Sequence, residues 1–248
     1  MLTTMHHAGP NGPLIVAHGL YGSARNWSVI GRRLSDIRDV HAVDMRNHGD
    51  SPREDTHDYP GMAADLAEVI EGSDGQADVL GHSMGGKAAM MLALTRPELV
   101  SRLIVADIAP VTYSDRQSHH IASMRRVDLA TVESRKEAEA QMRVEEPGVG
   151  PFLAQSLDLG GRRWKLNLDV LERDMGRIVG WPQVDARFEG PALFVAGETS
   201  DYVGAARHEG IRALFPTAEF ATISGAGHWL HAERPREFEA AVRAFLDA

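Results

Sequence analysis

The chain of 248 residues contains no cysteine, and aromatic residues make up only 6% of it. The lack of cysteine excludes disulfide bonds, thiolate nucleophiles and cysteine-ligated metals. No apolar run reaches the roughly 18 residues that a membrane span needs, and the stretch from Met1 to Pro13 lacks the pattern of a secretion signal. We therefore predict a protein with no membrane span and a cytoplasmic location.

The chain also has fewer basic than acidic residues: 26 Lys and Arg and 35 Asp and Glu give a formal net charge of −9. An acidic chain is repelled by phosphate backbones and anionic membrane surfaces, which excludes nucleic acid as a general partner. The length suits one large α/β domain with an inserted segment. Composition specifies no oligomeric state.

Short apolar runs dominate what is present, at residues 14–17, 40–43, 77–80, 103–106, 192–195 and 220–223. Runs that are apolar on both faces are typical of parallel strands covered by helices. Helical patterns over 61–71 and 84–95 alternate with these runs. This alternation predicts an α/β fold with a mostly parallel, doubly wound sheet.

The alternation breaks once, between about residues 111 and 190, where helical spacing continues and no convincing strand is found. Helices are expected over 128–146 and 166–178. We predict that residues 1–111 and 191–248 form the core and that 112–190 form an inserted helical cap. The acidic excess lies almost wholly outside 112–190, which leaves the cap able to face an anionic substrate.

The pentapeptide Gly81-His82-Ser83-Met84-Gly85 follows the predicted strand at 77–80. This G-x-S-x-G pattern is the nucleophile elbow, a sharp strand-to-helix turn that exposes one serine hydroxyl. A serine needs a neighbouring base, and His228, after the run 220–223 and a glycine-rich loop, is the candidate. Nucleophile, acid and histidine in that chain order are typical of α/β-hydrolases, so we predict a serine hydrolase with Ser83 as nucleophile.

A tetrahedral intermediate also needs two backbone N–H donors for its oxyanion. One donor should be the amide of Met84, at the start of the helix after the elbow, where the helix dipole favours negative charge. The other should be the amide of Leu20, directly after His18-Gly19 at the end of the first apolar run. We therefore predict an oxyanion hole formed by the amides of Leu20 and Met84.

The acid has two candidates. Asp107 directly follows the run 103–106. After the run 192–195, the position at which many α/β-hydrolases carry the acid is occupied by Ser200, and Asp201 is one residue further on. Either carboxylate can reach the second ring nitrogen of His228 and stabilise its protonated form. We predict Asp107 as the acid, and keep Asp201 as an alternative and Ser200 as a supporting hydrogen-bonding group.

Several strings together carry a family resemblance: HGLYGS at 18–23, VDMRNHGDSP at 43–52, GHSMGGKA at 81–88, DIAP at 107–110, IVGW at 178–181 and GAGHW at 225–229. Through them the chain resembles the YbfF-type bacterial esterases of the α/β-hydrolase superfamily over nearly its whole length. The resemblance implies an α/β-hydrolase fold and a cofactor-free hydrolase of small-molecule carboxylic esters or acyl thioesters. It also implies an acid at Asp107 and a serine at Ser200, whereas Asp201 stands where the family pattern leads us to expect a proline.

Other functions compete for the same motifs. Gly81-x-x-x-x-Gly86-Lys87 matches the start of a P-loop, but Ala88 stands where Ser or Thr must bind magnesium. We therefore expect Lys87 to extend toward solvent or a nearby acid. Perhydrolysis or C–C bond hydrolysis on the same triad, or a catalytically silent binding protein, are the alternatives, because fold does not determine substrate.

Twelve histidines raise the question of a metal. The adjacent side chains in the pairs His6-His7 and His119-His120 should diverge from each other, and no carboxylate partner is obvious. We therefore predict no metal and no cofactor. His82 is expected to be a packing residue, and His231 a surface or cap-facing one.

Overall fold

The computed structural model describes residues 1–73 and 75–248. Seven strands form one sheet in the order β1-β3-β2-β4-β5-β8-β9, in which every neighbouring pair is parallel except β1 and β3. The strands are β1 (Thr4–His7), β2 (Pro13–Ala17), β3 (Asp39–Val43), β4 (Ala77–His82), β5 (Val100–Ala106), β8 (Ala192–Gly197) and β9 (Ala218–Ile223). The predicted doubly wound, mostly parallel sheet is confirmed.

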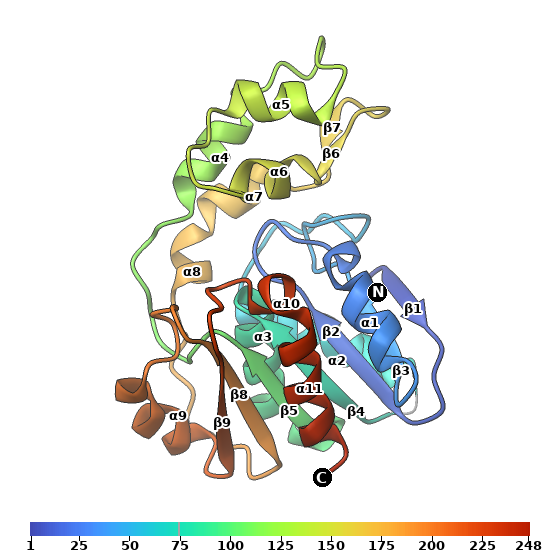
Figure 1. The fold of residues 1–248 in the computed structure, drawn as a ribbon, viewed down its shortest axis with the longest axis vertical. Coiled ribbons are helices and arrows are strands. Elements are labelled where there is room, and N and C mark those ends of the chain that lie inside the picture. The colour runs from blue at the N-terminus through green and yellow to red at the C-terminus, as the bar shows by residue number, and fades with distance from the viewer. Residues whose placement is uncertain (74) are drawn as a thin grey trace.

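Helices cover both faces of this sheet. In Figure 1, α1 (Ser28–Leu34) and α11 (Pro235–Leu246) lie on one face, and α2 (Tyr59–Glu71) and α3 (Met84–Thr95) lie on the other. Alternate residues of β2 divide between the two resulting cores: Leu14 and Val16 pack toward α1 and α11, and Ile15 toward α2 and α3. Side chains on a strand alternate between faces, so a strand buried on both sides must be apolar throughout.

Between β5 and β8 the chain leaves the sheet and forms a group of short elements beyond its end (Figure 1). We refer to residues 112–190, which the sequence predicts to be an inserted cap, as the cap segment. It contains α4 (Ser118–Met124), α5 (Arg135–Met142), α6 (Val149–Ala154), β6 (Leu157–Asp158), β7 (Arg163–Trp164), α7 (Leu168–Arg173) and α8 (Met175–Val179). The antiparallel ribbon of β6 and β7 was not predicted from the sequence.

The predicted helices of the cap segment were too long. Instead of running from 128, α5 begins after Ser134, whose side chain accepts a hydrogen bond from the amide of Glu137. Asp128 forms a turn, because its carboxylate accepts bonds from the Ala130 amide and the Thr131 hydroxyl. The expected helix over 166–178 is divided at Asp174 into α7 and α8.

Strand β1 was also missed, because Thr4-Met5-His6-His7 has no apolar run and alternates between exposed and half-buried positions. The remaining elements are η1 (Ala24–Trp27), η2 (Pro97–Leu99), η3 (Ala205–Arg207), α9 (His208–Leu214) and α10 (Leu230–Glu233). Each helix of the described residues is too short or too polar to cross a membrane.

The loops after the parallel strands meet at the carboxyl ends of these strands, where ligands of such sheets bind.

Candidate active site

Ser83 occupies the sharp turn between β4 and α3. Its φ of +52° lies in the left-handed region that side chains other than glycine rarely adopt. The turn depends on its two glycines: a Cβ on Gly81 would lie 2.2 Å from the carbonyl oxygen of Gly85, and a Cβ on Gly85 would lie 2.4 Å from that of Ala17. The predicted elbow is therefore present, and it directs the hydroxyl of Ser83 into a pocket.

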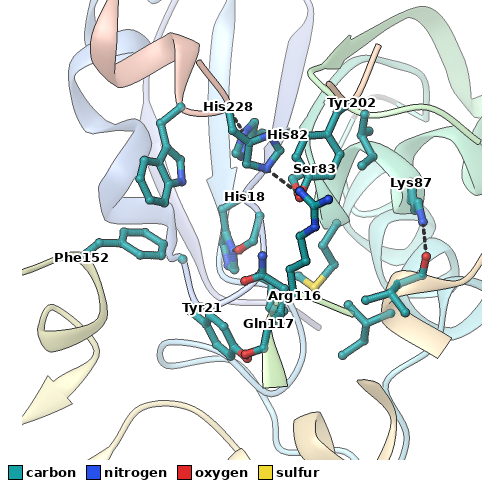
Figure 2. Close-up of a pocket in the computed structure, with 18 of the residues that line it drawn as sticks. His18, Tyr21, His82, Ser83, Lys87, Arg116, Gln117, Phe152, Tyr202 and His228 are labelled. Carbon is teal, nitrogen blue, oxygen red and sulfur yellow. Dashed lines mark hydrogen bonds between the residues drawn. The ribbon is translucent and has the colours of Figure 1, made fainter. Parts of the chain in front are cut away.

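His228 lies beside this serine, although 145 positions separate the two in the chain. The Oγ atom of Ser83 is 3.1 Å from Nε2 of His228, as the dashed line in Figure 2 marks. On the other side of the ring, Nδ1 is 2.7 Å from Oδ2 of Asp107. Because a carboxylate only accepts, Nδ1 carries the proton and Nε2 is left to accept from the serine hydroxyl.

Asp107 is fully buried just beyond the end of β5. Its Oδ1 accepts a 3.0 Å bond from the amide of Gly197, and its Oδ2 accepts a second bond from the hydroxyl of Ser200. Asp201 is exposed. The structure thus brings Ser83, His228, Asp107 and Ser200 together and leaves Asp201 outside this hydrogen-bonded group of the described residues.

Two aromatic rings support His228. The ring of Tyr202 stacks on it at 4.3 Å, and the Nε2 of His82 donates to the carbonyl oxygen of His228 at 2.8 Å. Burial lowers the pKa of His82 well below the usual value, so this ring stays neutral. His231 was expected to be a surface or cap-facing residue, but it is buried and stacks on Trp27 at 4.2 Å. A helix of four residues such as α10 is too short for its sequence to reveal which side faces inward.

Hydrogen bonds of two buried histidines, His18 and His48, fix the loop from His18 to Gly22, which carries Leu20. The Nε2 of His18 accepts a 3.0 Å bond from the amide of Met45, and its Nδ1 donates to the carbonyl oxygen of Gly19 at 2.8 Å. Burial lowers the pKa of His18 to about 4. A neutral ring can accept on one nitrogen and donate on the other, so the desolvated imidazole joins two loops.

His48 joins the same two loops in a similar way. It accepts a 3.1 Å bond from the amide of Tyr21, a residue with φ of +63°, and donates to the carbonyl oxygen of Arg46 at 2.9 Å. Burial, and then the nearby His18, lower the pKa of His48 to about 3. Sequence reasoning gave neither histidine a role. The string Arg46-Asn47-His48-Gly49 was the available signal, but its contacts lie across two loops.

The pocket above Ser83 has a volume of about 920 Å³ including space open to solvent. Leu20 and Met84, whose amides are predicted to form the oxyanion hole, line it together with Ser83. Phe152 of α6 lines its wall from the cap segment (Figure 2) and lies 5.8 Å from the ring of Trp229. Arg116 adds an exposed guanidinium to the same wall. The cavity is therefore largely apolar, with a few polar groups.

Lys87, on α3 one turn after Ser83, was expected to extend toward solvent or a nearby acid, but it is buried. It is 1% exposed, and its Nζ donates to the carbonyl oxygens of Val179 at 3.0 Å and Gly180 at 2.7 Å; Figure 2 marks one of these two bonds. The rings of Tyr59 and Tyr113 lie 5.5 Å and 4.9 Å from the same atom. Lys87 therefore ties the end of the cap segment to the helix that follows the elbow.

Burial, and secondarily the guanidinium of Arg207, lower the pKa of Lys87 to about 7. Between pH 7 and pH 9 the unfolded chain keeps this proton while the folded chain releases it, so stability rises with pH in this window. We expect the free energy of unfolding to rise by about 1–2 kcal/mol more in the wild type than in Lys87→Met. Urea denaturation at both pH values measures this difference.

The matched control is Lys136→Met, at an exposed position on α5. This variant should keep the pH dependence of the wild type. Parallel stability curves for the wild type and Lys87→Met would contradict the expectation.

Comparisons with known proteins agree with this architecture. The model of the alpha/beta hydrolase family matches residues 14–241. The chain is 39% identical over 241 residues to the esterase YbfF of Escherichia coli K12, covering 96% of this chain and 94% of that one. It is 40% identical over 246 residues to the sn-1-specific diacylglycerol lipase ABHD11 of Mus musculus, covering 94% of this chain and 80% of that one.

Among solved structures, a marine microorganism esterase superposes with a TM-score of 0.92 at 37% identity, covering 99% of this chain and 100% of that one. The family match extends well beyond half of the chain, and it agrees with the sheet order and the elbow described above. The chain belongs to the α/β-hydrolase family.

Proposed function

We propose that this protein is a serine esterase that cleaves carboxylic esters, with acyl thioesters as a second class of substrate. The observation that carries the proposal is the hydrogen-bonded series Ser83–His228–Asp107 at the floor of an apolar pocket, with distances of 3.1 Å and 2.7 Å. The names of the relatives, an esterase and a diacylglycerol lipase, support the ester bond as the target.

In the proposed reaction, His228 takes the proton of Ser83 as the serine oxygen attacks the carbonyl carbon of the ester. Asp107 holds the ring in the tautomer that can accept this proton, and stabilises the imidazolium that results. His228 then protonates the leaving alcohol or thiol, which leaves an acyl-enzyme on Ser83. Water, deprotonated by the same histidine, releases the acid.

The oxyanion of each tetrahedral intermediate is bound by the amides of Leu20 and Met84. The amide of Met84 is at the first position of α3, where the helix dipole adds to its attraction for an anion. The bond from the amide of Met45 to His18 and the bond from the amide of Tyr21 to His48 support the backbone around Leu20 before substrate arrives. Such preorganisation lowers the reorganisation needed during the reaction.

The cap segment acts in this proposal as an inserted cap that closes the pocket and bounds the acyl chain through Phe152. Its attachment to the core is supported by the bonds of Lys87 and by the ion pair of Lys165 with Asp50, 2.7 Å apart. The mechanism uses no cofactor. A cytoplasmic location remains a prediction from the sequence.

The test is hydrolysis of p-nitrophenyl esters of increasing chain length, combined with labelling by a fluorophosphonate, which traps a nucleophilic serine covalently. We expect ester turnover with an optimum set by the length of the pocket, and one phosphonyl group per chain on the peptide that contains Ser83. Labelling at another serine, or turnover that survives complete labelling of Ser83, would refute the proposal.

A further inference from the structure

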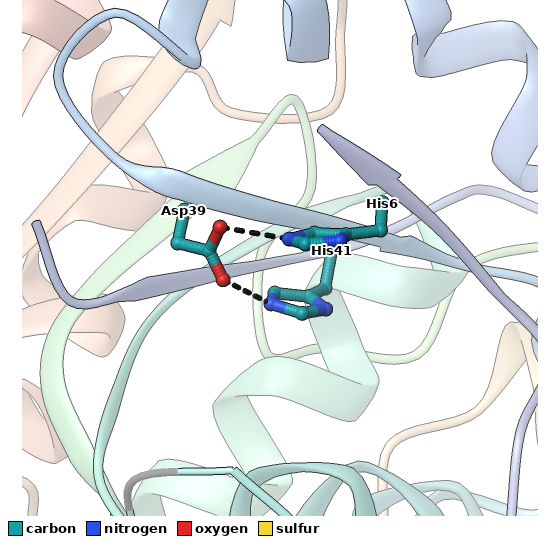
Figure 3. A group of neighbouring side chains, drawn as sticks. All are labelled: His6, Asp39 and His41. Carbon is teal, nitrogen blue, oxygen red and sulfur yellow. Dashed lines mark hydrogen bonds and ion pairs between the residues drawn. The ribbon is translucent and has the colours of Figure 1, made fainter. Parts of the chain in front are cut away.

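A second cluster of ionisable side chains lies at the edge of the sheet, formed by His6 of β1 with Asp39 and His41 of β3 (Figure 3). The Nε2 of His6 is 2.7 Å from Oδ1 of Asp39, and the Nε2 of His41 is 2.7 Å from Oδ2. The two imidazole rings stack at 4.4 Å with an angle of 15° between their planes. One carboxylate is therefore in hydrogen-bond contact with two nearly parallel imidazole rings.

Strand geometry explains why these residues meet. Side chains two positions apart share a face of a strand, so Asp39 and His41 project on the same side of β3. His6 is paired directly with His41 in the antiparallel register of β1 and β3. His7 points to the opposite face, where its ring approaches Gly31 of α1. Adjacent histidines do diverge here, but His6 meets its partners on another strand.

The three side chains have the geometry and charge that a cation requires. One donor atom from each lies within 4.8 Å of the others. The carboxylate of Asp39 accepts a hydrogen bond from each of the two rings, so it supplies the negative charge of the cluster. The Gly9 amide, 3.0 Å from Oδ1, also fixes its orientation.

We propose that His6, Asp39 and His41 form a binding site for a divalent transition-metal ion, with Zn²⁺ as the best match. Two imidazole nitrogens and one carboxylate oxygen are ligands that Zn²⁺ prefers, and water completes the coordination. Each neutral ring then carries its proton on Nδ1 and coordinates through Nε2. The ion joins β1, the only antiparallel strand of the described sheet, to β3.

A rival cluster exists in the cap segment, where His119, His120 and Glu146 also bring three donor atoms within 4.8 Å of one another. Arg126 and Arg143 line the same hollow of the surface and repel a cation. His119 is 3.1 Å from Glu146, a longer contact than either in the first cluster. His119 of this second cluster therefore provides the matched control for His6.

The experiment is titration of the metal-free protein with Zn²⁺, followed by calorimetry, and with Co²⁺, followed by its visible spectrum. We expect one ion per chain in the wild type. His6→Gln, a change at a half-exposed position on the edge strand, should weaken binding at least about tenfold, and His119→Gln should leave it unchanged. Zn²⁺ should raise the Tm of the wild type and of His119→Gln more than that of His6→Gln.

Asp39→Asn is the second variant, because it removes the charged ligand and keeps the side-chain volume. Both variants should hydrolyse esters as the wild type does, which shows that they are folded. The proposal is overturned if the wild type binds no Zn²⁺ at micromolar concentration, or if His119→Gln removes the ion. It is also overturned if His6→Gln binds Zn²⁺ with the affinity of the wild type and the bound ion inhibits ester hydrolysis. The ion would then lie at His228 rather than at His6.

Discussion

Replacing Ser83 by alanine is expected to lower kcat for ester hydrolysis by about 10⁴-fold or more, with little change in KM. The hydroxyl that attacks the carbonyl is then absent, so His228 and Asp107 have no nucleophile to activate. Members of a triad act as a unit, and the residual rate comes from the oxyanion hole and from substrate binding alone. Steady-state hydrolysis of a p-nitrophenyl ester by both proteins measures the ratio.

Ser114→Ala is the matched control, because Ser114 lines the same pocket and is exposed. Its kcat should stay within about threefold of the wild type, because its exposed hydroxyl is not part of the hydrogen-bonded series Ser83–His228–Asp107. Similar losses in the two variants, or more than about one percent of wild-type activity in Ser83→Ala, would exclude Ser83 as the nucleophile.

Asp107→Asn is expected to lower kcat by about 10³- to 10⁴-fold. The amide has nearly the shape of the carboxylate, so it can still occupy the buried position beside Gly197 and Ser200. However, it cannot stabilise the imidazolium, and its NH₂ group can donate to Nδ1 and turn His228 into the wrong tautomer. The loss should therefore appear in kcat rather than in KM.

Asp201→Asn provides the comparison, because it makes the same chemical change one loop away at an exposed position. We expect its kcat to stay within about threefold of the wild type. Equal losses in the two variants would contradict the choice of Asp107, and a larger loss in Asp201→Asn would assign the role of the acid to Asp201. Thermal unfolding of both variants separates a catalytic loss from a folding defect.

The sequence was most informative where structure depends on neighbouring residues. The helix predicted over 84–95 agrees with α3, and each predicted strand falls within an observed one. These elements carry strong local signals, such as glycines around a sharp turn and apolar runs on both faces. The segment 128–146 failed for a related reason: its charges suit a helix, but Asp128 and Ser134 bond to the nearby backbone and shorten it.

Several features of the site required contacts between distant segments. Both Asp107 and Asp201 follow a strand, so the sequence kept Asp201 as an alternative, and the contact between Asp107 and His228 became visible only in the folded chain. Lys87 resembled an ordinary helix residue until the end of α8 supplied two carbonyl oxygens for it. The sequence identifies a side chain as ionisable, but the extent of its desolvation depends on the segments that pack over it in the folded chain.

The sequence by itself thus determined the family, the order of strands and helices along the chain, and the candidates Ser83 and His228, because these depend on short motifs and hydrophobic periodicity. The sequence favoured Asp107 over Asp201, and the tertiary structure brings Asp107 to His228. The tertiary structure alone decided that His18 and His48 support the loop of Leu20, and that His6 meets Asp39 and His41. Each of these contacts joins segments brought together by strand pairing and loop packing, which no local pattern encodes.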